Sequence, residues 1–89
     1  MGGFIVLNQK DNVAVAVENI KPGEPAELST GASLTALAEI AFAHKIAIVP
    51  IFRGDKVYKY GEVIGEATRD IKAGEHVHVH NIRSLRGAK

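Results

Sequence analysis

Hydrophobic and polar residues alternate over short runs along most of this chain. Strand-like runs, which are β-branched or alternating, occupy residues 4–7, 13–17, 47–51, 57–60, 63–64 and 75–81. Such runs are typical of strands that bury one face, and turn signals such as Gly54-Asp55 and Gly61 separate them. We therefore predict a mainly β single domain with short turns and at most one short helix.

A short turn motif recurs along the chain. The sequence Asn-Ile-Lys-Pro-Gly-Glu at residues 19–24 returns as Asp-Ile-Lys-Ala-Gly-Glu at residues 70–75. The Asn or Asp side chain can bond nearby backbone N–H groups, the Ile can anchor the turn in the core, and the Gly permits a positive φ. A weaker third copy, Glu-Ile-Ala-Phe-Ala-His, lies at residues 39–44.

Residues 32–45 permit two interpretations. Their alanine and leucine content is typical of a helix, and Leu34, Leu37 and Ile40 fall near helical spacing. If the third turn copy is real, the same residues form a strand that runs into a turn. We favour the strand and turn because tertiary context often overrides helix propensity.

The bulk composition limits the class of protein. The chain has 89 residues, 46% of them hydrophobic and 24% charged, so we expect one small globular domain. Its net charge is +1 without a run of like charges, which argues against a dedicated nucleic-acid binder. Because the core is small, homo-oligomerisation could contribute to stability.

Cysteine and long apolar segments are both absent from the sequence. Without cysteine the chain has no disulfide framework and no thiolate nucleophile. No apolar stretch approaches about 18 residues and no leader pattern is present at the N-terminus. We therefore expect a soluble cytoplasmic protein that does not insert into a membrane.

Three of the four histidines lie within residues 75–81, Glu-His-Val-His-Val-His-Asn. In a β-strand, successive side chains point to opposite faces, so His76, His78 and His80 would line one face while Val77 and Val79 pack on the other. Imidazole binds transition metals and transfers protons near neutral pH. The alternative is a polar edge strand without chemistry, and the spacing alone does not decide between the two.

The sequence Lys59-Tyr60-Gly61 is a second candidate site. A lysine can hold a carboxylate or sulfonate, and a tyrosine hydroxyl can donate or accept a hydrogen bond beside it. The alternative is an exposed lysine next to a half-buried tyrosine in an edge hairpin. A serine or cysteine triad, a phosphate-binding glycine loop and a spaced carboxylate pair are all absent from the sequence.

Several motifs in order resemble a known family. They are His-Lys-Ile-Ala at residues 44–47, Tyr-Lys-Tyr-Gly at 58–61, Ile-Gly-Glu-Ala-Thr-Arg-Asp-Ile-Lys-Ala-Gly-Glu-His-Val-His-Val-His-Asn at 64–81, and the opening Asp-Asn-Val-Ala-Val-Ala at 11–16. Together they resemble the SAF domain of the altronate and galactarate dehydratase family. The sequence departs from the family pattern at Ala43, where glycine is usual, and at Phe42, where a small residue or proline is usual.

The resemblance implies a β-clip, a long hairpin folded on itself, for residues 1–82, with residues 83–89 as a C-terminal tail or linker. Members of the family are hydro-lyases acting on sugar acids, and the small subunit of sulfolactate sulfo-lyase is a close branch. The large catalytic domain of the family is absent from these 89 residues. We therefore expect a small subunit or N-terminal domain that contributes one wall of the active site to a large catalytic subunit and is inactive alone.

The resemblance also implies roles for particular residues. His78 and His80 are expected to be catalytic, and His44, His78 and His80 are candidate ligands of a divalent metal, Fe²⁺ or Mn²⁺, bound together with the large subunit. Lys59, Tyr60 and Asn81 are expected to bind the sugar-acid substrate. His76 falls at a variable position of the family pattern.

Other functions remain open at this point. One is a non-catalytic carbohydrate-binding module, because SAF-like domains also occur in sialic acid synthases and in pilus or flagellar assembly chaperones. Another is a protein that sequesters or delivers metal ions. The histidine-rich segment favours the dehydratase branch, while the identity of the hydroxy acid is not determined by these residues.

Overall fold

The computed structural model describes residues 2–6, 8–28, 31 and 33–84, and all regular secondary structure in these ranges is β. The strands are β1 (Gly2–Ile5), β2 (Val13–Ala16), β3 (Pro25–Leu28), β4 (Ser33–Thr35), β5 (Lys45–Ala47), β6 (Lys56–Lys59), β7 (Glu62–Ala67), β8 (His76–Val77) and β9 (Ile82–Ser84). The predicted mainly β class is confirmed. Within the described ranges, no helix is long and apolar enough to cross a membrane.

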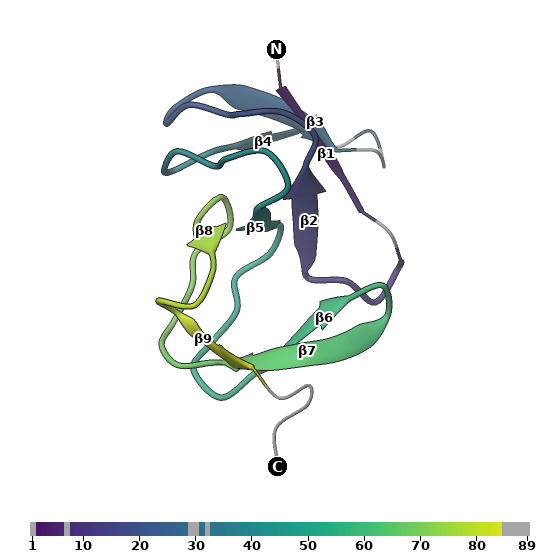
Figure 1. Ribbon diagram of the computed structural model, residues 1–89, viewed down its shortest axis with the longest axis vertical. Coiled ribbons are helices and arrows are strands. Elements are labelled where there is room, and N and C mark those ends of the chain that lie inside the picture. The colour runs from purple at the N-terminus through teal and green to yellow at the C-terminus, as the bar shows by residue number, and fades with distance from the viewer. Residues whose placement is uncertain (1, 7, 29–30, 32, 85–89) are drawn as a thin grey trace.

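The strands form two sheets. One has the order β4-β3-β1-β2-β5-β8 and the other the order β6-β7-β9. The pair β1–β3 is parallel, and the other pairs are antiparallel. In Figure 1, β3 and β4 lie at one end of the molecule, β6, β7 and β9 at the other, and β2, β5 and β8 between them.

Each end of the molecule has its own hydrophobic core. The first core contains Phe4, Ala14, Ala16, Ile20, Leu28, Ala36, Ile40 and Ile46. The second contains Val13, Ala47, Ile51, Val57, Ala67, Ile71 and Val77. The central strands β2 and β5 supply residues to both cores, so burial of apolar surface at either end holds the same two strands in place.

The segment 33–45 follows the strand-and-turn interpretation. Strand β4 is followed by a turn and then by β5, with no helix among these residues, while residue 32 lies outside the described ranges. The Ile40 N–H and C=O groups exchange hydrogen bonds with Ile20, at 2.9 and 2.8 Å. Tertiary pairing therefore overrides the local helix propensity of this alanine-rich segment.

The turn motif occurs four times instead of three. In each copy a buried isoleucine precedes a residue with positive φ by three positions; the pairs are Ile20 with Gly23, Ile40 with Ala43, Ile51 with Gly54, and Ile71 with Gly74. The fourth copy, residues 50–55, went unrecognised because Pro50 replaces the leading Asn or Asp. The signal that could have found it is an alanine four residues before each isoleucine.

The backbone carbonyl groups of those four alanines accept hydrogen bonds from the turns. The backbone N–H of the positive-φ residue donates to an alanine carbonyl in every copy: Gly23 to Ala36, Ala43 to Ala16, Gly54 to Ala67 and Gly74 to Ala47, at 2.7–2.9 Å. The copies also pair with one another through isolated antiparallel β-bridges, which join Ile20 to Ile40 and Ile51 to Ile71. One pair of turns therefore lies in each core, and the Gly74–Ala47 and Ala43–Ala16 bonds tie the turns to the central strands.

Ala43 adopts the turn geometry that glycine adopts in the other copies. Its φ is 72°, beside values of 80° to 92° for the three glycines. The departure from the family pattern at this position therefore leaves the turn unchanged, although a left-handed conformation costs a non-glycine residue about 1–2 kcal/mol. The Phe42 backbone N–H donates to Asn19 Oδ1 at 2.8 Å, which holds the turn against the first copy.

Two strand predictions need correction. Residues 48–50 leave the sheet after β5, since the Ala47 carbonyl accepts from Gly74 and residue 50 is a proline, which has no N–H to donate. The predicted strand over residues 75–81 ends at Val77, as described below. Leu7, at the end of the first predicted strand, lies outside the described ranges.

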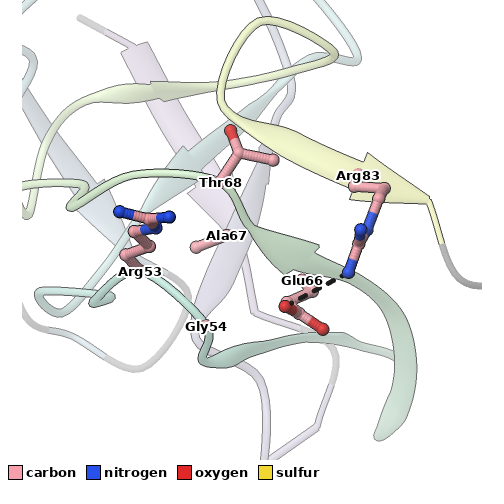
Figure 2. Close-up of a pocket in the computed structure, with 6 residues that line it drawn as sticks. All are labelled: Arg53, Gly54, Glu66, Ala67, Thr68 and Arg83. Atoms are coloured by element: carbon pink, nitrogen blue, oxygen red, sulfur yellow. Dashed lines mark ion pairs between the residues drawn. The ribbon is translucent and has the colours of Figure 1, made fainter.

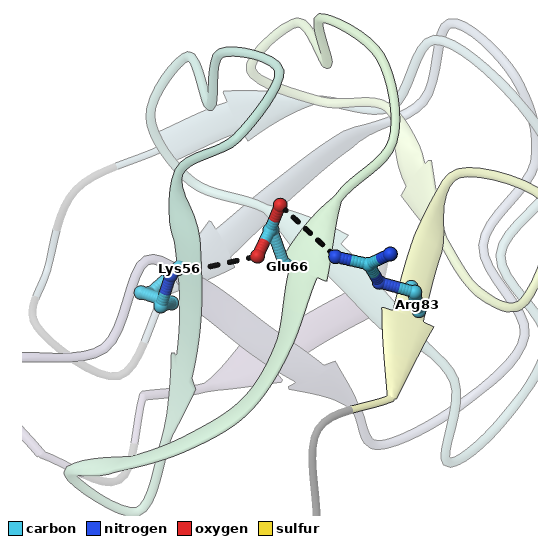
Figure 3. A network of polar contacts seen from close by, with 3 residues as sticks. All are labelled: Lys56, Glu66 and Arg83. Atoms are coloured by element: carbon cyan, nitrogen blue, oxygen red, sulfur yellow. Dashed lines mark hydrogen bonds and ion pairs between the residues drawn. The ribbon is translucent and has the colours of Figure 1, made fainter. Parts of the chain in front are cut away.

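The second sheet is joined on its surface by a network of charged side chains. Glu66 of β7 contacts Lys56 of β6 at 3.5 Å and Arg83 of β9 at 3.3 Å (Figure 3). These side chains are partly exposed, so each pair stabilises the fold by less than about 1 kcal/mol. Strand β9 includes residues on both sides of the predicted boundary between a domain that ends at residue 82 and a tail that begins at residue 83. That boundary stays a prediction.

Candidate functional site

The histidine segment does not form the extended strand that its alternation suggested. Strand β8 contains only His76 and Val77, and residues 78–81 form a turn. Val79 is 81% exposed at this turn and does not pack in the core. The interpretation of one strand with histidines on one face and valines on the other is therefore wrong, because a turn breaks the two-residue period.

The imidazole rings nevertheless gather in one cluster, and they do so from two segments far apart in sequence. His44 ends the third turn directly before β5, and His76 begins β8, which pairs with β5 in an antiparallel register that places His76 opposite Ile46. The ring centroids of His44 lie 5.1 Å from those of His76 and 4.8 Å from those of His78. Pairing of β5 with β8 therefore creates the cluster.

Two of these rings meet at hydrogen-bond distance. His44 Nδ1 lies 2.9 Å from His76 Nε2. One potential ligand nitrogen from each of His44, His76 and His78 lies within 4.8 Å of the other two. His80 is at the edge of the cluster, where its ring is tilted by 35° to that of His76 at a centroid distance of 5.4 Å.

The Asn81 side chain stabilises the turn at residues 78–81 through hydrogen bonds to the backbone. Its side chain is fully buried, with Oδ1 accepting from the His78 backbone N–H at 3.0 Å and Nδ2 donating to the His76 carbonyl at 2.8 Å. Its backbone also accepts a bond from the Thr68 N–H at 3.0 Å. Both polar ends of the Asn81 side chain are thus used inside the fold, and this residue positions His76 and His78.

The surroundings of His76 and His78 favour the neutral form of these two rings. Partial burial, together with the neighbouring His44, His80 and Lys45, lowers the pKa of both His76 and His78 from the usual 6.5. Burial and the nearby charge of Lys59 likewise lower the pKa of Lys45. A neutral imidazole has a lone pair that can accept a proton or bind a metal ion.

In the Lys59-Tyr60 candidate, Lys59 ends β6 and Tyr60 follows in the tight turn between β6 and β7. Tyr60 and Gly61 both have positive φ, and the buried carboxylate of Asp11 accepts their backbone N–H groups at 3.1 and 2.8 Å. This anchor leaves the Tyr60 side chain 61% exposed, with Lys59 Nζ 5.2 Å from its ring centroid. The turn therefore presents an amine and a phenol to solvent.

Lys45 connects the two candidate groups. The charges of Lys45 and Lys59 are close enough to affect each other, and Lys45 in turn acts on His76 and His78. We call this set, His44, Lys45, Lys59, Tyr60, His76, His78 and His80, the histidine–lysine surface. Neither Lys45 nor His76 was selected as a site residue from the sequence, because only the β5–β8 register brings them into the cluster.

A separate hollow lies in the second sheet. Its volume is about 350 Å³, and it is lined by Arg53, Gly54, Glu66, Ala67, Thr68 and Arg83 (Figure 2). Arg83 and Glu66 pair at 3.3 Å on one side of the hollow, whereas Arg53, from the fourth turn, lies on the other. None of the four histidines lines this hollow, so it is not part of the histidine–lysine surface.

Comparison with known proteins gives consistent matches. The family model for the altronate/galactarate dehydratase SAF domain matches residues 2–85. An altronate dehydratase of Bacillus subtilis is 40% identical over 94% of the chain, and one of Escherichia coli is 40% identical over 91%. The chain spans only 17% and 16% of the length of these two proteins.

A second group of relatives is much shorter. The alpha subunit of (2R)-sulfolactate sulfo-lyase from Chromohalobacter salexigens is 32% identical over 93% of this chain, and the match covers 95% of that subunit. A domain of this size therefore occurs both within long proteins and as a separate subunit.

Proposed function

Because this chain belongs to the altronate/galactarate dehydratase SAF domain family, we propose that it provides one wall of the active site of a sugar-acid hydro-lyase. The remaining wall belongs to a large catalytic subunit or domain. The observation that carries the proposal is the histidine–lysine surface, which gathers four imidazoles, two amines and a phenol. Such a surface suits a substrate that is anionic and must both lose and gain protons.

Dehydration of a sugar acid has several steps, and side chains of the histidine–lysine surface can assist each of them. Dehydration of a hydroxy acid removes the proton α to the carboxylate and expels the β-hydroxyl as water. In our proposal, His78 and His80 exchange protons with the reacting groups, and Lys59 and Tyr60 hold the substrate carboxylate. A divalent metal, Fe²⁺ or Mn²⁺, would supply Lewis acidity at the departing hydroxyl.

Asn81 has a different part in this proposal. Its buried amide is bonded to the backbone of His76 and His78, so it supports the reaction by positioning these rings. Lys45 contributes charge to the same surface, because it interacts electrostatically with Lys59 and with His76 and His78. In this proposal the chain lines only one side of the substrate and a large catalytic subunit or domain lines the other, which is why we propose that the chain is inactive alone.

A second candidate function is the small subunit of a sulfolactate sulfo-lyase. It is supported by the 32% identity between this chain and a sulfo-lyase alpha subunit over 95% of that subunit. A sulfonate and a carboxylate are both anions that a lysine can bind. The two functions therefore use the same surface and differ in substrate and in the partner chain.

The proposal is tested by reconstitution. The chain would be assayed with altronate, galactarate and sulfolactate, alone and together with its candidate large catalytic subunit. We expect turnover only from the mixture, and a fall of about 100-fold or more in kcat for His78→Gln, since general acid–base groups contribute about 10²–10⁴-fold. The substrate that is turned over distinguishes the hydro-lyase from the sulfo-lyase.

A matched pair of lysines on β6 tests the substrate clamp. Lys59→Gln is expected to raise KM about tenfold, because it removes one charged contact with the anion. Lys56→Gln, three residues away and paired with Glu66, is expected to change KM by less than about twofold. Turnover by the chain alone, or equal effects of the two lysine variants, would contradict the proposed wall.

A further inference from the structure

We propose that His44, His76 and His78 form a divalent transition-metal site that belongs to this chain itself. The proposed site uses His76, which sequence resemblance placed at a variable position, and leaves His80 outside the ligand set. The inference rests on the proposed function and narrows it: with a ring nitrogen bound to the ion, His78 acts as a ligand, and the proton exchange proposed for His78 and His80 is left to His80. Metal binding by the chain can be measured without partner or substrate.

The nitrogen positions support this ligand set. Two imidazole nitrogens bound to one ion at about 2.0–2.1 Å are roughly 2.8–3.0 Å apart in octahedral geometry and roughly 3.3–3.4 Å apart in tetrahedral geometry. His44 Nδ1 and His76 Nε2 lie 2.9 Å apart, close to the octahedral separation. One ligand nitrogen from each of the three rings lies within 4.8 Å of the other two, so binding one ion requires the rings to close by no more than about 2 Å.

The backbone holds two of the three ligands in rigid segments. His44 directly follows Ala43, whose N–H donates to the carbonyl of Ala16 in β2, and precedes β5. His76 is in β8, paired with β5, and its carbonyl accepts from the buried Asn81 amide. A site whose ligands are already positioned loses little conformational entropy when the ion binds.

The donor set indicates the class of ion. Three imidazoles without a carboxylate suit borderline divalent cations such as Zn²⁺, Co²⁺ and Fe²⁺ better than Ca²⁺ or Mg²⁺, which prefer oxygen ligands. Three protein ligands leave further coordination positions open. Because imidazoles add no negative charge, the bound ion keeps its full charge and would attract an anionic oxygen ligand to the histidine–lysine surface.

The test uses the 89-residue chain purified without a histidine tag. Co²⁺ alone and Zn²⁺ alone are titrated by calorimetry, and absorption spectra of the Co²⁺ form report its coordination. We expect one ion per chain, with His76→Gln lowering the affinity for Co²⁺ at least about tenfold. His80→Gln, from the turn that follows β8, is the matched control and is expected to change the affinity by less than about threefold.

A second measurement needs no substitution. Zn²⁺ should shift the ring resonances of His44, His76 and His78 in ¹⁵N-resolved NMR spectra and leave those of His80 nearly unchanged. Absence of a stoichiometric Co²⁺ or Zn²⁺ complex, or a loss in His80→Gln equal to that in His76→Gln, would overturn the site. If metal binding fails while the reconstituted enzyme still depends on His78, the proposed wall stands and only the metal site is wrong. If the chain binds metal but His78→Gln turns over at the full rate, the metal site stands and the proposed wall is wrong.

Discussion

Replacing Asn81 by alanine should destabilise the fold and loosen the histidine cluster at the same time. The substitution removes the bond from the His78 N–H at 3.0 Å and the bond to the His76 carbonyl at 2.8 Å, at a side chain with 0% exposure. A net loss of about 0.5–1.5 kcal/mol per hydrogen bond, plus the cost of leaving buried partners unsatisfied, predicts a decrease of about 2–4 kcal/mol in the free energy of unfolding.

That decrease is large for so small a domain. A chain of this length has a total stability of roughly 4–13 kcal/mol, and 1 kcal/mol shifts Tm by about 4–8 °C. We therefore expect Tm to fall by roughly 8–30 °C, measured by circular dichroism together with urea unfolding. With only four histidines in the chain, NMR titration can follow each ring separately. In the variant, the pKa values of His76 and His78 should rise toward 6.5 as the rings separate and become more solvated.

Asn12 provides a matched control. Its Nδ2 donates to the Lys56 carbonyl at 2.9 Å and its Oδ1 accepts from the Tyr58 N–H at 2.8 Å, so it makes the same pair of bonds to the backbone of β6. Asn12→Ala should also destabilise the fold but leave the histidine titrations unchanged. The reasoning is refuted if Asn81→Ala costs less than about 0.5 kcal/mol, or if it leaves the pKa values of His76 and His78 at their wild-type positions.

Three further predictions concern the turns and the response to pH. Ala43→Gly should stabilise the fold by about 0.5–1 kcal/mol in urea unfolding, because it relieves a left-handed conformation at φ 72°; a destabilised variant would mean that the methyl group contributes packing that outweighs this strain. Gly74→Ala should destabilise more than Gly54→Ala by at least about 1 kcal/mol, since a Cβ at Gly74 would collide with a backbone oxygen and a leucine side chain while the Gly54 site is open; equal losses would contradict the close approach. Stability should also fall as pH is lowered from 7 through the pKa of the folded His76 and His78, because these pKa values lie below 6.5 and the unfolded chain therefore binds more protons in that window. Urea unfolding at a series of pH values checks this, and a His76→Gln/His78→Gln double variant with the wild-type pH dependence would refute it.

Much of the fold could be read from the sequence because its signals are local. Alternating apolar residues predicted β1, β2, β6 and β7, and the repeated Ile-x-x-Gly spacing predicted the turns, since a buried isoleucine and a permissive φ are properties of single positions. Strands β3 and β9 were missed. They are only four and three residues long, and their extended conformation depends on pairing with β1, β4 and β7.

For the candidate site as well, some features could be predicted from the sequence and others depend on the tertiary structure. The sequence alone identified the imidazole-rich segment 75–81, the preceding turn, and a family pattern that included His44, because residue types and their order are sufficient for that recognition. Only the tertiary structure decided that His76 faces His44, that His80 lies at the edge, and that Asn81 is buried beneath the turn. These features depend on the antiparallel register of β5 and β8 and on the point where β8 ends, and both are set by packing and hydrogen bonds between segments about 30 residues apart in sequence.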